Sequence, residues 1–384
     1  MIRMDETIQN DPSGIQMILT IKLTSLAFNI HDGFTISSSE NRKNNGQNGH
    51  SNHHNDSVIN EIMTSERILK ERKSRAVYET PSPLEYFGYM YFFGGILTGP
   101  AFDFVEYSTS VDLSKYNQHY KDGKKHLPSP FYPAIGKLLS SLIFVAVYEF
   151  LRPSYPNSLL RNPEFLYSQR SIFAKFFDIL IICFCEKSKY YFVWLIAEGG
   201  CNLCYFGFEG YSKDGKPMWG GISNVDVIGF ETTQSVRNCT TLWNTNTSLW
   251  LRRYVYERAP PPYNLIATYI VSAFWHGFYP GYYLFFFSMG VFQVTARICR
   301  TKVRPYFLDS NGEPLPSKRI YDLLGFLVTY SLVHYFSTSF ILLYTDQVLE
   351  LWKSFYFIGH IALLIGLSFS FIPKKRIHHK VKSN

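Results

Sequence analysis

Several apolar runs in this chain approach the roughly 20 residues that an α-helix needs to cross a bilayer. The hydrocarbon core offers no water to the backbone, so a spanning helix must satisfy its own amide and carbonyl groups. The sequence therefore predicts an all-α integral membrane protein that crosses the bilayer several times. The runs lie at 15–32, 131–151, 171–185, 190–208, 321–343 and 353–372.

The formal net charge is +8, which in a soluble protein would raise nucleic acid as a partner. Here the basic residues form short clusters at the ends of apolar runs, and no nucleic-acid motif accompanies them. Clusters of this kind set orientation, because cytosolic loops are rich in Lys and Arg. The loop 344–352 holds Asp346 and Glu350, whereas 374–382 is basic, so we expect a lumenal turn followed by a cytosolic C-terminus.

Composition divides the chain into three parts. Residues 1–14 are polar and contain no signal-peptide pattern. Residues 15–372 form the predicted multi-span membrane domain, and 373–384 form a basic cytosolic tail. Within the membrane domain, 37–60 is rich in Ser, Asn and His and is predicted to be a disordered insertion.

Cys201 and Cys204 have the spacing of a metal or redox pair. The chain has six cysteines but no second pair with this spacing, and the surroundings are apolar. Small buried thiols are the better interpretation, so the sequence predicts no metal site.

One imidazole, that of His276, lies in the middle of an apolar segment at 264–296. A titratable group in such a segment costs free energy unless it has a partner, so it is a candidate functional residue. Gly277, Pro280 and Gly281 follow it and should break the helix. Both flanks of the segment are basic, which predicts a hairpin with His276 at its turn. The alternative is a core histidine held by one hydrogen bond.

The chain carries a motif in two halves. The first half reads Trp243-Asn244, with Trp250-Leu251 six residues after Asn244, and the second reads Ser-Ala-Phe-Trp-His-Gly-Phe-Tyr-Pro-Gly-Tyr-Tyr over 272–283. Together with Asn224-Val225-Asp226, they resemble the signature of the membrane-bound O-acyltransferases, closest to the branch that reacylates lysophospholipids. The resemblance extends from about Gln16 to the C-terminus. It implies a polytopic helical bundle, and the family's further N-terminal helices are expected to be missing from this chain.

The resemblance implies an enzyme that moves an acyl group from acyl-CoA, as co-substrate, to the free hydroxyl of a lysophospholipid, with no resident cofactor. It also implies that Asn244 and His276 are the two active-site residues. Histidine can act as the base that removes the hydroxyl proton. The asparagine amide can donate to the thioester carbonyl or hold the acceptor hydroxyl. No serine or cysteine stands beside His276 in a nucleophile motif, so direct transfer is expected.

Arg252, Arg253 and Arg258 are candidates to bind the phosphates of CoA. The alternative for these arginines is that their charge serves only to orient the chain in the membrane.

Two rival functions stay open at this stage. Within the resembled family, the acceptor could be a sterol, a diacylglycerol or a protein. From another class, the chain could be a non-catalytic multi-span transporter or scaffold, with His276 as a relay or structural group. The sequence does not fix the oligomeric state. Lys380 and Lys382 resemble a dilysine address and predict a multi-pass protein of the endoplasmic reticulum membrane.

Overall fold

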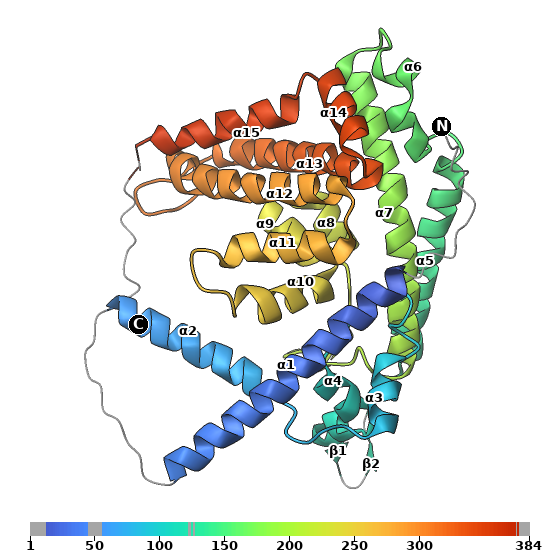
Figure 1. Cartoon of the computed structure of the whole chain (residues 1–384), viewed down its shortest axis with the longest axis vertical. Helices are drawn as coiled ribbons and strands as arrows, with labels where there is room; N and C mark the ends of the chain where they lie inside the picture. The colour runs from blue at the N-terminus through green and yellow to red at the C-terminus, as the bar shows by residue number, and fades with distance from the viewer. Residues whose placement is uncertain (1–12, 45–55, 122–123, 126, 374, 376–384) are drawn as a thin grey trace. The chain divides into compact units, whose positions relative to one another are not determined.

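The computed structural model describes residues 13–44, 56–121, 124–125, 127–373 and 375 (Figure 1). Most of these residues are helical, and the strands among them form two short antiparallel hairpins. The predicted all-α membrane architecture is therefore confirmed. The chain forms two compact units, and helices α5 (Phe131–Leu151) and α7 (Ile172–Leu203) contribute residues to both.

The first unit comprises the described parts of 1–140, 193–224 and 252–258. In it, α1 packs against α2, α3 and α4. The start of α3 is fixed by a capping box, in which the Ser82 amide donates to Glu85 at 2.8 Å and the Glu85 amide donates to the Ser82 hydroxyl. Its elements are α1 (Ser13–Asn44), α2 (Asp56–Lys73), α3 (Pro83–Met90), α4 (Phe104–Val111), η1 (Ser114–His119), β1 (Tyr120–Lys121), β2 (Lys124–Lys125), β3 (Gly210–Tyr211), β4 (Pro217–Met218) and η3 (Arg252–Tyr256).

The second unit comprises 141–192, 225–251 and the described part of 259–384. In it, α10, α11, α12 and α13 stack in that order, and α15 packs on α12 and α13 (Figure 1). Its elements are η2 (Asn157–Arg161), α6 (Pro163–Leu166), α8 (Val227–Thr232), α9 (Val236–Leu242), α10 (Thr245–Leu251), α11 (Asn264–His276), α12 (Pro280–Ile298), η4 (Cys299–Val303), η5 (Arg304–Phe307), α13 (Lys318–Leu342), α14 (Thr345–Ser354), α15 (Ile358–Ser368) and η6 (Phe369–Phe371).

Small residues let the helices of the second unit approach closely. A Cβ atom added at Gly359 of α15 would overlap the Tyr335 ring of α13, and one added at Gly366 would overlap the Thr295 methyl group of α12. Close backbone approach of this kind is how helices pack where lipid surrounds them, because lipid removes the hydrophobic drive between helices.

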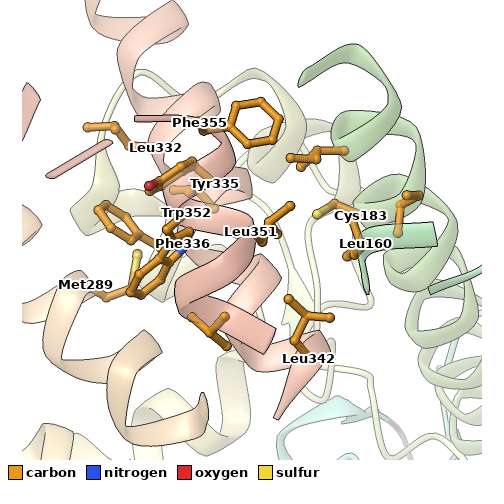
Figure 2. Close-up of a cluster of buried hydrophobic side chains, with 14 of the residues drawn as sticks. Leu160, Cys183, Met289, Leu332, Tyr335, Phe336, Leu342, Leu351, Trp352 and Phe355 are labelled. Atoms are coloured by element: carbon orange, nitrogen blue, oxygen red, sulfur yellow. The ribbon is translucent and has the colours of Figure 1, made fainter. Parts of the chain in front are cut away.

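The core of the second unit is built on aromatic side chains of α13 and α14. Figure 2 shows Tyr335, Phe336 and Trp352 together at its centre, with Leu351 on the side of Cys183. The Tyr335 and Trp352 rings stack at 5.9 Å between centroids. This packing fixes α13 against α14.

Four of the described helices are long and apolar enough to cross a membrane. They are the Ser13–Glu40 part of α1, α5, α12 continued to Phe307, and α13. A fifth candidate is the pair α14 and α15, which is bent by 77°. The chain is therefore a multi-pass membrane protein. The span predicted at 131–151 coincides with α5.

Two other span predictions were wrong in detail. The structure has one continuous helix, α7, where the sequence predicted separate spans at 171–185 and 190–208. It also has a helix, α14, where a loop was predicted at 344–352, so the second arm predicted at 353–372 begins with the end of α14 and continues as α15.

The prediction of a disordered insertion at 37–60 is wrong at both ends. Helix α1 continues to Asn44, and α2 begins at Asp56. The residues between them lie outside the described residues, as do nearly all of the predicted N-terminal part and C-terminal tail.

Candidate active site

His276 is the last residue of α11, at the turn of the predicted hairpin. The helix ends there because Gly277 adopts φ +123° and ψ −170°, a conformation that is essentially restricted to glycine. Helix α12 begins at Pro280, whose fixed φ suits the first helical position. The two arms predicted within 264–296, and the break between them, are therefore confirmed.

Gly281 fixes this turn against the end of α13. Its amide donates to the Leu343 carbonyl oxygen at 2.7 Å. A Cβ atom at this position would overlap the Ser339 carbonyl oxygen and lie 2.8 Å from the Leu343 Cα. The turn after His276 is thus placed by backbone contacts that only glycine permits.

Aromatic rings surround the His276 imidazole. The Phe286 ring stacks on it at 5.3 Å, the Phe340 ring meets it edge-on at 4.9 Å, and the Tyr282 ring lies at 5.7 Å, all between centroids. No hydrogen bond to the imidazole is formed within the part of the chain that the structure describes. A substrate group would therefore not have to displace a partner among those residues, which argues against the alternative of a hydrogen-bonded core histidine.

Asn244 sits in the break between α9 and α10. Its φ of +48° is left-handed, a region that asparagine tolerates better than most residues. Its carbonyl oxygen accepts from the Ser248 amide at 3.0 Å, which joins it to the first turn of α10. On the other side, Trp243 forms an antiparallel bridge with Val225, so the backbone of Asn244 is held at both ends.

The two active-site candidates lie at the ends of helices that pack together. Asn244 directly precedes α10, His276 ends α11, and α10 and α11 are in contact within the second unit. The Trp250 and Trp275 rings meet across this contact at 6.0 Å between centroids. The Asn244 amide and the His276 imidazole thus come from neighbouring elements of the same compact unit. The assignment of both residues as catalytic stays a prediction.

The three arginines predicted to bind phosphate lie in the first unit, where each has an acidic partner. Arg258 holds Asp32 through two hydrogen bonds of 3.1 and 2.6 Å, and Arg253 holds Asp103 at 2.8 Å. Arg252 pairs with Glu71 at 2.8 Å and with Glu257 at 3.2 Å. A phosphate would have to compete with a carboxylate at each position. Phosphate binding by these arginines therefore stays a prediction.

These ion pairs continue into a buried network with α1. The Tyr254 hydroxyl lies 2.8 Å from the Asn29 amide oxygen and 2.7 Å from an Asp103 carboxylate oxygen. Burial, together with the charge of Asp103, raises the pKa of Tyr254, so its hydroxyl keeps its proton and can donate. Lys22 of α1 donates to the Tyr89 carbonyl oxygen at 2.9 Å. Lys22, Asn29 and Asp32 of α1 thus each have a polar partner within the first unit.

Sequence reasoning missed a second polar cluster, in the second unit. It includes Lys187 of α7, whose ammonium lies within hydrogen-bonding distance of both Glu231 of α8 and His334 of α13. The signal was present, because Lys187 interrupts an apolar run and His334 lies inside another.

A family model described as MBOAT, membrane-bound O-acyltransferase family, matches residues 9–338. Among similar proteins, "Lysophospholipid acyltransferase" of Schizosaccharomyces pombe is 32% identical over 97% of this chain and 69% of its own length. "Lysophospholipid acyltransferase 6" of Drosophila melanogaster is 32% identical over 93% of this chain. "Membrane-bound glycerophospholipid O-acyltransferase 2" of Homo sapiens is 33% identical over 93% of this chain. The chain spans 46% of the fly protein's length and 64% of the human protein's length.

Proposed function

Because the chain belongs to the membrane-bound O-acyltransferase family, we propose that it transfers a fatty acyl group from acyl-CoA to the free hydroxyl of a lysophospholipid. The names of the relatives support this choice of acceptor. The observation that carries the proposal is that Asn244 and His276 stand at the ends of two helices that pack together in one unit.

In the proposed reaction, an unprotonated nitrogen of His276 takes the hydroxyl proton as the hydroxyl oxygen attacks the thioester carbon. The carbon–sulfur bond then breaks, and CoA leaves as the thiol with the proton that His276 returns. The Asn244 amide donates to the oxygen that becomes negative in the transition state, which in a water-poor site is worth about 3 kcal/mol. The transfer is direct, without an acyl-enzyme.

Acyl-CoA is proposed as a co-substrate, and no resident cofactor or metal enters the proposed chemistry. The phosphates of CoA are proposed to meet the arginines at 252, 253 and 258, where each would exchange one carboxylate partner for a phosphate. Arg252 is the most accessible of the three, with 43% of its side chain exposed, compared with 20% for Arg253 and 17% for Arg258.

The test is acyl transfer in membranes that contain the chain, with radiolabelled oleoyl-CoA and a panel of lysophospholipids. His276→Ala and Asn244→Ala should each lower turnover by at least about 100-fold, because each removes a group that acts in the transition state. His360→Gln, a second histidine among aromatic rings, and Asn238→Ala, an exposed asparagine of α9, are matched controls that should retain turnover.

Other outcomes decide between the alternatives. Transfer to a sterol, a diacylglycerol or a protein instead of a lysophospholipid would keep the enzyme class and replace the acceptor. Wild-type membranes that transfer to none of these acceptors would favour the non-catalytic reading. Full turnover in His276→Ala or Asn244→Ala would refute the assignment of that residue.

We also propose that the protein resides in the endoplasmic reticulum with its C-terminus in the cytosol. Support comes from the basic tail, which includes the dilysine-like pair Lys380 and Lys382. An epitope placed just upstream of the last five residues should be accessible to antibody after selective permeabilisation of the plasma membrane. An epitope that stays protected until internal membranes are dissolved would contradict this orientation.

A further inference from the structure

Glu231 is the centre of a polar cluster next to the candidate active site. One of its carboxylate oxygens accepts from the Lys187 ammonium at 2.6 Å and from the Tyr191 hydroxyl at 2.5 Å. Tyr191 is fully buried, and the Glu231 side chain is 19% exposed. Lys187 and Tyr191 are one turn apart on α7, so Glu231 joins α8 to one face of that helix.

The cluster extends to α13 through His334. An ammonium group can only donate, so the contact of 2.9 Å between Lys187 Nζ and His334 Nε2 requires that Nε2 accept. The proton of the imidazole is then on Nδ1, which lies 2.6 Å from the Tyr330 carbonyl oxygen. Lys187 therefore links the Glu231 carboxylate to a neutral, oriented histidine, and the cluster ties together α7, α8 and α13.

Two residues that this cluster holds in place, Tyr191 and Phe230, pack their rings against Trp243. The Tyr191 ring meets the Trp243 ring at 5.6 Å and the Phe230 ring meets it at 5.1 Å, both between centroids. Tyr191 is held by its hydrogen bond to Glu231, and Phe230 directly precedes Glu231 in α8. Trp243 in turn directly precedes Asn244.

We propose that Glu231 is a positioning residue for Asn244, acting through Tyr191, Phe230 and Trp243. Asn244 must hold a left-handed backbone conformation between two helices, and its amide nitrogen is bonded directly to Trp243. If Tyr191 and Phe230 lose their fixed positions, Trp243 can turn. The Asn244 amide then departs from the geometry that the transition state needs. This inference rests on the proposed function only for its catalytic consequence, because the mechanical claim concerns the backbone.

Two variants separate the cluster from the ring packing. Tyr191→Phe keeps the ring against Trp243 and removes only the hydroxyl that reaches Glu231. Glu231→Gln keeps the side-chain length and an oxygen that can accept, but leaves Lys187 without its opposite charge. The matched control is Glu186→Gln, which removes a carboxylate of the same unit that is paired with Arg152 at 3.0 Å and is 14% exposed.

The first readout does not depend on activity. Amide hydrogen exchange, followed by mass spectrometry of detergent-solubilised protein, reports on the Ser248 amide bonded to Asn244 and the Asp226 amide bonded to Leu242. Exchange in 243–249 should become faster in Tyr191→Phe and Glu231→Gln and remain at the wild-type rate in Glu186→Gln. Unchanged exchange in both variants overturns the proposal, whether or not the protein transfers acyl groups.

The second readout is the division between kcat and KM, measured per folded molecule. Both variants should lower kcat by about tenfold and leave the KM for oleoyl-CoA within about twofold, because a misplaced group costs transition-state binding rather than ground-state binding. A purely structural role would lower the amount of folded protein without changing kcat per folded molecule, and that result overturns the proposal. If the wild-type protein shows no turnover, the proposed function is refuted. The exchange data then still decide whether Glu231 positions Asn244.

Discussion

Replacing Gly281 by alanine tests how the turn after His276 is placed. The added Cβ would overlap the Ser339 carbonyl oxygen and lie 2.8 Å from both the Cα and the carbonyl oxygen of Leu343. All of these atoms belong to the backbone at the end of α13, so no side-chain rotation can relieve the overlap. The start of α12 has to move away from α13, and the hydrogen bond from the Gly281 amide to the Leu343 carbonyl oxygen is lost or lengthened.

The expected cost has two parts. Overpacking against fixed neighbours typically costs about 1–3 kcal/mol. Loss of a backbone hydrogen bond between buried groups adds about 1 kcal/mol. The better helix propensity of alanine offsets less than about 1 kcal/mol of this cost, because Gly281 lies in the first turn of α12 and not in the helix interior. We therefore expect Gly281→Ala to lower the free energy of unfolding by about 1–3 kcal/mol.

The assay is the thermal unfolding midpoint of purified protein in detergent, with turnover measured on the folded fraction. Gly136→Ala in α5 is the matched control, because a Cβ at Gly136 would meet no atom within 4 Å. That variant should be as stable as wild type or slightly more stable. Since the displaced turn bears His276, Gly281→Ala should also lower kcat. A midpoint for Gly281→Ala equal to that of Gly136→Ala would refute the argument that this contact sets the turn.

Two further substitutions test the helix break after His276 and the ion pair between Asp32 and Arg258. Gly277→Ala should destabilise the protein by about 1–3 kcal/mol, because a φ of +123° strains any residue with a Cβ; a thermal midpoint at the wild-type value would contradict this. Asp32→Asn should cost about 2 kcal/mol, less than the roughly 3–5 kcal/mol of a fully buried pair, because the Arg258 side chain is 17% exposed. The check is chemical denaturation in detergent, and a smaller loss in Lys73→Gln, which breaks a more exposed pair with Glu40, is the expected comparison.

The parts of the fold that follow from local chemistry could be predicted from the sequence. A mostly apolar run of the right length gave the bounds of α5, because Lys137 and Glu149 are the charged residues in this helix and the stretch between them is long and mostly apolar. The break after His276 could be predicted because Gly277 and Pro280 act on their own backbone. Asn244 and His276 came from a motif, and the packing of α10 on α11 now places them at the ends of neighbouring helices.

The parts that depend on distant partners could not be predicted. Charges at Glu186, Lys187 and Lys189 divide the apolar run of α7, so the sequence suggested two spans. In the structure, Lys187 pairs with Glu231 and Glu186 pairs with Arg152, which lets the helix continue through them. Helix α14 was missed for another reason: its acidic start resembles a loop, although Val348, Leu351 and Trp352 recur at helical spacing and are buried.

The three arginines carry both a local signal that the sequence shows and contacts with distant partners that it does not show. Basic flanks orient a membrane protein, and acidic residues contribute little to that effect, so pairing with Glu71, Asp103 and Asp32 leaves the orientation signal of Arg252, Arg253 and Arg258 intact. The same pairing changes what they can bind. The two-point contact of Arg258 with Asp32 uses both ends of the guanidinium fork, which is the geometry a phosphate would need. Arg252 is the most exposed of the three and is held by single contacts, so it would need the least rearrangement to meet a phosphate, and we rank it first among the three candidates.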